Sequence, residues 1–145
     1  MRDQTQHASN PWGLLLAAWL LAMVSTLAAL FIGEVMGKTP CVLCWFQRIC
    51  MFPLAVLLTV ACYRSDFSAW IYVLPLAVIG WVIALYHCLV FAGVIPEALK
   101  PCSAGVSCSG ADMLIFTIVP LPLISLLAFS SIVLLLVLIR RRTLV

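Results

Sequence analysis

Charged side chains are scarce in this sequence. Of its 145 residues only 9% are Asp, Glu, Lys or Arg, whereas 66% are hydrophobic. Soluble domains carry about 25% charged residues, so this chain has too few polar groups to cover a water-facing globular surface. Its net charge of +3 is also small and concentrated at the chain ends, which argues against a nucleic-acid partner. We therefore expect a protein surrounded largely by lipid.

The sequence also lacks a polar stretch long enough to form a second domain, an internal repeat and a heptad pattern. We expect a single integral membrane domain over residues 1–145. About 20 apolar residues span a bilayer core as a helix, and four apolar runs meet this requirement, at about 12–32, 41–63, 67–91 and 113–139. The predicted fold class is an all-α membrane protein, an antiparallel four-transmembrane-helix bundle.

The first apolar run has a second interpretation, as a secretory signal peptide, because small residues such as Ala28 and Ala29 follow its apolar core. The apolar region of a signal peptide is usually only about 7–15 residues long. Residues 12–32 contain 21 residues without a charge. We therefore interpret this run as a helix that is not cleaved.

Basic residues predict how the helices are oriented. Consecutive spanning helices alternate in direction, so both termini and the turn at Arg64 fall on one side of the membrane. The loops of the other side contain only Lys38 and Lys100 as basic residues. The first side contains five arginines: Arg2, Arg64, Arg140, Arg141 and Arg142. Because basic loops stay in the cytoplasm, we expect both termini to be cytoplasmic and the loop at 92–112 to be outside.

Seven cysteines divide into two groups. Those inside apolar runs are expected to behave as small buried hydrophobic residues: Cys50, Cys62 and Cys88. Those in or beside the outer loops lie where disulfides persist: Cys41, Cys44, Cys102 and Cys108. The outer group has three interpretations, which are structural disulfides, a metal site and redox catalysis.

Redox catalysis is the interpretation that the Cys41–Cys44 pair favours. A disulfide closed over two residues removes little chain entropy, and Cys-x-x-Cys is typical of thiol exchange. The spacing of the four outer cysteines fits no compact zinc site, so we expect no metal. The pair follows Pro40 at the start of the second run, and a helix amino terminus stabilises the thiolate that attacks disulfides.

Two further residues lie near the depth of this pair. Arg48 follows Cys44 by four residues and therefore shares its helix face. It is predicted either to stabilise a thiolate or a negatively charged acceptor, or to anchor the helix by extending to the surface. His87 lies one turn from the outer end of the third run. It is predicted either to line the acceptor pocket or to form a hydrogen bond inside the bundle.

The second pair, Cys102 and Cys108, lies in a loop rich in Gly, Ser and Pro. Such a loop is expected to be exposed, so an arriving protein can reach a disulfide there. Cys41 and Cys44 lie instead near the lipid boundary, within reach of an apolar carrier. Two pairs of different exposure indicate an electron relay from a protein dithiol to a lipid-soluble oxidant.

Three segments together resemble the DsbB family of disulfide-generating membrane proteins. They are Cys-Val-Leu-Cys-Trp-Phe-Gln-Arg-Ile at 41–49, the segment around His87, and Lys-Pro-Cys-Ser-Ala-Gly-Val-Ser-Cys-Ser-Gly at 100–110. The short spacing of the second cysteine pair is closer to the BdbC-type branch than to DsbB itself. The resemblance covers nearly the whole chain.

This resemblance implies a multi-pass protein of the bacterial cytoplasmic (inner) membrane whose cysteine loops face outside. It also implies quinone-dependent oxidation of an extracytoplasmic thioredoxin-like thiol oxidase, similar to DsbA or BdbD. The partner's thiolate would attack Cys102, with Cys108 as its resolving residue. Cys41 would exchange with the loop pair, Cys44 would be the sulfur nearest the quinone, and Arg48 would hold the quinone head group. Ubiquinone and menaquinone both stay open as the acceptor.

Two other functions stay open. A vitamin K epoxide reductase-like protein is also a small helical bundle with two cysteine pairs, but that family generally places Cys-x-x-Cys after the loop pair. A non-catalytic membrane scaffold would use both pairs as structural disulfides. Such a scaffold would keep them oxidised when a thiol partner is added, whereas a relay would form a mixed disulfide through Cys102.

Overall fold

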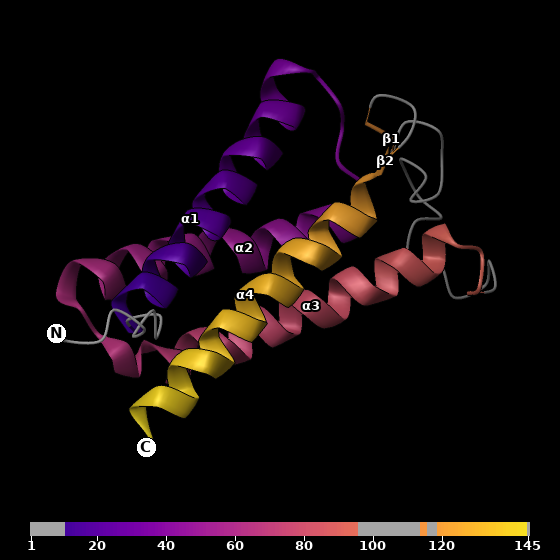
Figure 1. Ribbon diagram of the computed structural model, residues 1–145. Helices are drawn as coiled ribbons and strands as arrows, with labels where there is room; N and C mark the ends of the chain where they lie inside the picture. The colour runs from indigo at the N-terminus through magenta and orange to yellow at the C-terminus, as the bar shows by residue number, and fades with distance from the viewer. Residues whose placement is uncertain (1–10, 96–113, 116–118, 145) are drawn as a thin grey trace, which may run out of the picture.

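The computed structural model describes residues 11–95, 114–115 and 119–144, and this part of the chain is almost entirely helical (Figure 1). Its main elements are α1 (Pro11–Leu30), α2 (Val42–Arg64), α3 (Trp70–Phe91) and α4 (Leu121–Thr143). A π-helical turn, η1 (Phe31–Val35), extends α1, and a 3-10 turn, η2 (Phe67–Ala69), precedes α3. Within the described residues, four helices are long and apolar enough to cross a membrane, which confirms the predicted helical class.

The fourth helix differs from its prediction. A start near residue 113 is wrong, because α4 begins at Leu121 and continues to Thr143. It is preceded by a short antiparallel pair of strands, β1 (Leu114–Ile115) and β2 (Val119–Pro120). Two prolines explain the late start. Pro120 has an extended backbone and Pro122 lies in the first turn, where a helix tolerates the missing N–H of proline.

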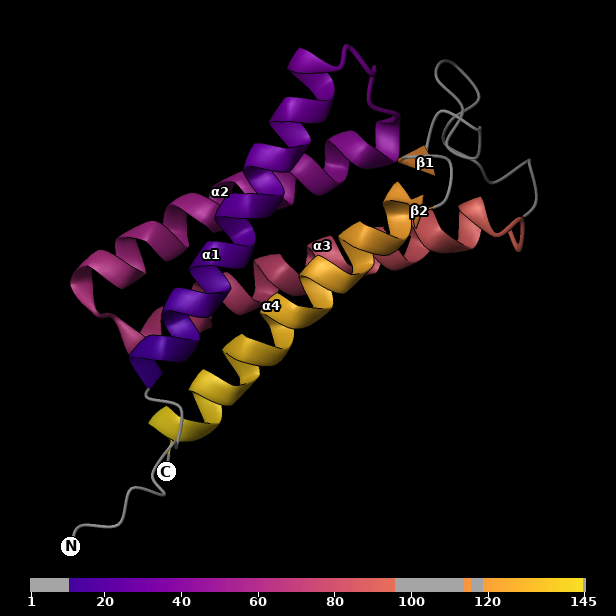
Figure 2. The same ribbon diagram turned by 45° about the horizontal axis from the view of Figure 1, so that its top comes forward.

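The four helices form a closed ring of contacts in which α1 packs against α2 and α4, and α3 packs against the same two helices. Figures 1 and 2 both show the start of α1 and the end of α4 at one end of the molecule. The opposite end holds η1, the start of α2, the end of α3 and the β1–β2 pair. The start of α2, which carries the Cys-x-x-Cys pair, therefore lies beside the end of α3.

Small residues form much of the interface between the helices. Five alanines, drawn from three of the four helices, are fully buried: Ala18, Ala22, Ala61, Ala77 and Ala84. Small side chains let membrane helices approach one another closely, so that dispersion contacts between the backbones stabilise the bundle. Large apolar side chains such as Val56 and Leu134 face outward instead, as suits a lipid environment.

Two tryptophan side chains connect the helices in pairs through hydrogen bonds. Trp19 of α1 donates its indole N–H to the Thr59 hydroxyl of α2 at 2.8 Å. Trp81 of α3 donates in the same way to the Ser130 hydroxyl of α4 at 2.9 Å. Hydrogen bonds between helices contribute about 0.6–2 kcal/mol each in membranes. They fix the register of α2 on α1 and of α4 on α3.

A substitution at Gly80 of α3 tests how closely α3 and α4 approach one another. A Cβ atom at this position would overlap the ring of Phe129, which is buried in the core. We expect Gly80→Ala to lower the free energy of unfolding by about 1–3 kcal/mol, as overpacking does elsewhere, despite the better helix propensity of alanine. Thermal unfolding in detergent measures the change.

The matched control is Gly13→Ala in α1, where an added Cβ meets nothing within 4 Å. This variant should unfold at the temperature of the wild type or slightly above it. Equal stability of the two variants would contradict the tight contact at Gly80.

Candidate functional site

Cys41 and Cys44 lie at the amino terminus of α2, as predicted. Cys41 is the N-cap residue, and its Sγ accepts a hydrogen bond from the backbone N–H of Cys44 at 3.4 Å. Both residues are free thiols whose Sγ atoms lie 3.2 Å apart. A disulfide bond is about 2.05 Å long, so about 1 Å of movement would close it. The pair is therefore arranged for reversible oxidation.

The local sequence explains why a cysteine caps this helix. Pro40 cannot continue a helix toward the amino terminus, and Cys41 has the extended backbone of an N-cap residue, with φ −69 and ψ 168. An N-cap side chain normally offers an oxygen to the unpaired N–H groups of the first turn. Here a sulfur takes that position. Because the helix dipole favours an anion at this end, the cap is strongest when Cys41 is a thiolate.

The two sulfur atoms have different surroundings. Cys41 is only 1% exposed and packs in a small cluster with Leu43 and Val90. Cys44 is partly exposed and lines a cavity. A small molecule in that cavity would therefore meet Cys44 before Cys41.

The charge of the reduced pair is expected on Cys41. Its hydrogen bond with Cys44 holds the pKa of the Cys41 thiol well below the ordinary value. Burial opposes this effect, whereas His87 and the backbone N–H of Cys44 lower the pKa further. A free cysteine has a pKa of about 8.5, so at neutral pH this arrangement favours a thiolate on Cys41.

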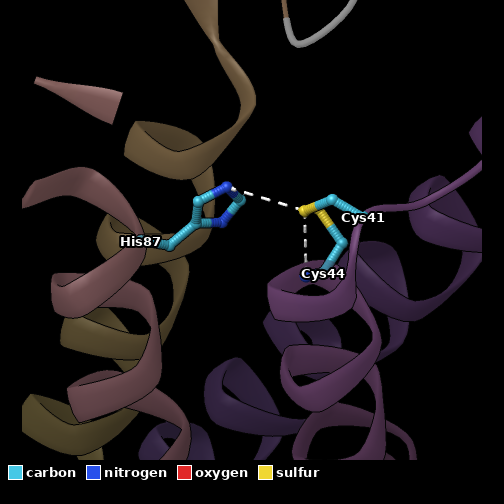
Figure 3. A group of neighbouring side chains, drawn as sticks. All are labelled: Cys41, Cys44 and His87. Atoms are coloured by element: carbon cyan, nitrogen blue, oxygen red, sulfur yellow. Dashed lines mark hydrogen bonds between the residues drawn. The ribbon is translucent and has the colours of Figure 1, made fainter. Parts of the chain in front are cut away.

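His87 of α3 points at the sulfur of Cys41 (Figure 3). Its Nε2 atom lies 3.8 Å from Cys41 Sγ, and its Nδ1 atom lies 3.1 Å from the amide nitrogen of Gln47. The His87 side chain is fully buried, and it is not among the residues that line the cavity beside Cys44. Of its two predicted roles, the geometry favours a hydrogen bond inside the bundle.

The cavity beside Cys44 has a volume of about 490 Å³ and lies between α1, α2 and α4. Most of its lining is apolar, and Cys44, Gln47 and Arg48 contribute polar groups. Small-molecule sites in proteins typically have volumes of about 300–1,000 Å³ and combine apolar walls with a few polar groups. The cavity is therefore suited to a small apolar ligand with a polar head.

Arg48 is held at the wall of this cavity by α1. Its Nη2 atom donates a hydrogen bond to the carbonyl oxygen of Ala29 at 2.6 Å. The guanidinium also lies 5.8 Å from the centre of the Trp45 ring. Gly33, in the π-helical turn η1, leaves room for it, because a Cβ there would lie only 3.0 Å from Nη2. Arg48 is thus turned toward α1 rather than extended away from the bundle.

A metal ion is an alternative occupant of the cysteine pair. The ligand atoms of Cys41, Cys44 and His87 lie within 4.8 Å of one another, and zinc is commonly bound by cysteine and histidine. Metal binding requires both thiolates, so it is incompatible with a disulfide between them. The expectation that the protein holds no metal stays a prediction.

The other predicted site residues differ in how far the structure places them. Cys102 and Cys108 lie outside the described residues, so their relation to Cys41 stays a prediction. Cys50 is buried in the core, as expected for a small hydrophobic residue. Gln47 was not among the predicted site residues. The sequence marks it only as a polar amide within an apolar run. Burying such an amide costs free energy unless it is hydrogen-bonded.

Comparison with known proteins places these features in a family context. Residues 10–139 match the family described as "Disulfide bond formation protein DsbB". The chain is 60% identical to a "Probable disulfide formation protein" of Metapseudomonas resinovorans, over 95% of this chain and 96% of the relative. It is 38% identical to "Disulfide bond formation protein C" of Bacillus subtilis, over 82% and 86% of the two chains. No solved structure matches the chain significantly.

The hydrogen bond between the two sulfurs can be tested at Cys44. Cys44→Ala removes the donor to Cys41, so the pKa of Cys41 should rise. As the pH is lowered, the alkylation rate of Cys41 should therefore drop at a higher pH than in the wild type. Cys44→Ser keeps an O–H donor and should retain most of the lowering. Mass spectrometry that follows alkylation of Cys41 against pH measures both variants. Identical profiles for alanine and serine would contradict the assignment.

Proposed function

Because this chain belongs to the DsbB family of disulfide bond formation proteins, we propose that it is a thiol:quinone oxidoreductase. In this proposal it reoxidises an extracytoplasmic thioredoxin-like disulfide oxidase and so supports disulfide formation in exported proteins. The observation that carries the proposal is the position of Cys44. Its sulfur lies 3.2 Å from that of Cys41, and it lines the same apolar cavity as Arg48.

The proposed membrane arrangement is a single integral domain built as an antiparallel four-helix bundle in the bacterial cytoplasmic membrane. Four helices of sufficient length and apolarity support it, as does the position of the start of α1 and the end of α4 at the same end of the molecule (Figure 2). The basic residues Arg140–Arg142 lie in the last turn of α4, at this end of the molecule. By the positive-inside rule, both termini are cytoplasmic and Cys41 faces the outside.

The proposed reaction passes two electrons along four sulfur atoms. A reduced partner attacks the Cys102–Cys108 disulfide, and the partner's disulfide forms as the loop pair becomes a dithiol. The loop dithiol then exchanges with the Cys41–Cys44 disulfide in the same way. A quinone is the final two-electron acceptor. In this last step the two thiols of Cys41 and Cys44 and one quinone give one disulfide and one quinol. Oxidases of the DsbA type have potentials near about −120 mV, so their reoxidation needs a strong oxidant.

The described residues have distinct parts in this proposal. The cavity of about 490 Å³ would hold the quinone ring next to Cys44. Arg48, positioned by the Ala29 carbonyl, donates hydrogen bonds to a quinone oxygen and stabilises the negative charge that develops there. Cys41 lies on the other side of the pair and exchanges with the loop cysteines. Ubiquinone and menaquinone share this chemistry.

Replacing Cys44 tests the route directly. Cys44→Ser leaves Cys41 without a sulfur partner, so purified protein should no longer reduce quinone when it is given reduced partner. Absorbance of the quinone measures the rate. The control is Cys62→Ser near the far end of α2, which should retain the wild-type rate because Cys62 lies outside the proposed relay. Sustained quinone reduction by Cys44→Ser would overturn the proposed route.

Gly33 tests the position of Arg48 without removing the arginine. In Gly33→Ala the new Cβ would lie 3.0 Å from Arg48 Nη2, so the guanidinium must shift by a few tenths of an ångström. We expect KM for quinone to rise about tenfold, equivalent to about 1.4 kcal/mol of binding energy, while thiol exchange with the partner is unchanged. Steady-state kinetics with varied quinone measures KM. A normal KM for quinone would contradict the role given to Arg48.

A further inference from the structure

We propose that Gln47 is a positioning residue that fixes His87 in the tautomer with its proton on Nε2, so that His87 donates to the Cys41 thiolate. This inference rests on the proposed function of the Cys41–Cys44 pair and deepens it. Two contacts carry it. The Gln47 amide nitrogen lies 3.1 Å from His87 Nδ1, and His87 Nε2 lies 3.8 Å from Cys41 Sγ.

Burial makes these contacts significant. Gln47 is 6% exposed, His87 is fully buried and Cys41 is 1% exposed. A polar group in such surroundings costs free energy unless it is hydrogen-bonded, and polar residues within membrane-spanning helices usually serve a function. The Gln47 amide and the His87 ring come from α2 and α3, so neither contact is a by-product of local helix geometry. The two side chains satisfy one another across the helix interface.

The tautomer follows from the donor and acceptor properties of the groups. In the orientation that the Gln47 amide has in the structure, its nitrogen faces His87 Nδ1 and can only donate, so Nδ1 accepts. A neutral imidazole that accepts at Nδ1 carries its proton on Nε2. That is the atom next to Cys41. The Nε2–H group therefore donates to the thiolate, whereas the other tautomer would place a lone pair against the negative sulfur.

Charged and titratable groups on the neighbouring elements bear on this role. From α2, the titratable groups beside it are the thiols of Cys41 and Cys44. The basic residues of α4 lie in its last turn, at Arg140–Arg142, at the opposite end of the helix from Cys41. Arg48 is engaged by the Ala29 carbonyl of α1. Tyr86 of α3 packs against the cluster around Cys41, and Gln47 is the residue that lies 3.1 Å from His87 Nδ1.

The consequence for the relay lies in the step that releases Cys41. A loop thiolate attacks Cys41 Sγ, the Cys41–Cys44 bond breaks, and Cys44 leaves with the electron pair. The second loop thiolate then attacks the loop sulfur of this mixed disulfide, a loop disulfide forms, and Cys41 leaves as a thiolate. A leaving group that is stabilised as a thiolate leaves faster. His87, held by Gln47, therefore accelerates the second step.

The first experiment measures the tautomer of His87 directly. Nitrogen-15 NMR of histidine-labelled reduced protein in detergent distinguishes the two neutral tautomers, and a His7→Gln background leaves His87 as the sole histidine. We expect the Nε2–H form. Gln47→Glu, whose carboxylate can only accept, should transfer the proton to Nδ1 or produce an imidazolium. An Nδ1–H tautomer in the wild-type protein would overturn the proposal.

The second experiment measures the effect on sulfur. Gln47→Leu should shift the pH midpoint of Cys41 alkylation upward by about one unit, the scale of one hydrogen bond to a charged group. It should also cause the mixed disulfide between the loop and Cys41 to accumulate during turnover. Unfolding at the wild-type temperature shows that the variant is folded. Because Gln47 also lines the cavity, KM for quinone is measured alongside.

The outcomes separate this inference from the proposed function. An unchanged alkylation midpoint in folded Gln47→Leu would overturn the role of Gln47, even if quinone reduction is normal in the wild type. A raised KM for quinone with an unchanged midpoint would also overturn it, because Gln47 would then act only as a wall of the cavity. Failure of wild-type protein to reduce quinone would overturn the proposed function and leave the tautomer measurement interpretable.

Discussion

The hydrogen bonds that converge on Cys41 Sγ are the feature on which the site depends. This sulfur caps α2 by accepting the backbone N–H of Cys44, lies 3.2 Å from the Cys44 sulfur and faces Nε2 of His87. A helix amino terminus, a thiol and an imidazole all favour negative charge at one buried atom. Reactivity and helix capping are thus combined in a single residue.

The surrounding helices give the two sulfur atoms different partners. On one side, α3 places Nε2 of His87 next to Cys41. The Gln47 amide of α2 contacts the other ring nitrogen, Nδ1. On the other side, α1 and α4 enclose the cavity next to Cys44, and the Ala29 carbonyl positions Arg48 at its wall. The bundle therefore separates the sulfur suited to thiol exchange from the sulfur suited to meet a small apolar acceptor.

Much of this arrangement could be predicted from sequence because it depends on local patterns. Apolar run length located the helices, and Pro40 before Cys-x-x-Cys placed the pair at a helix start. The start of α4 was missed because residues 113–120 are as apolar as the helix, and only Pro120 and Pro122 mark the true boundary. The pairing of Gln47 with His87 depends on how α2 packs on α3, which single-helix periodicity does not reveal.

In the proposed relay, the Cys41–Cys44 dithiol delivers its electrons to a quinone in the neighbouring cavity. The most direct test purifies the protein in mild detergent, identifies the quinone that accompanies it, and follows the redox state of that quinone after one equivalent of reduced partner is added. One quinol should form for each disulfide gained by the partner. Oxidation of the partner without quinol formation would contradict it.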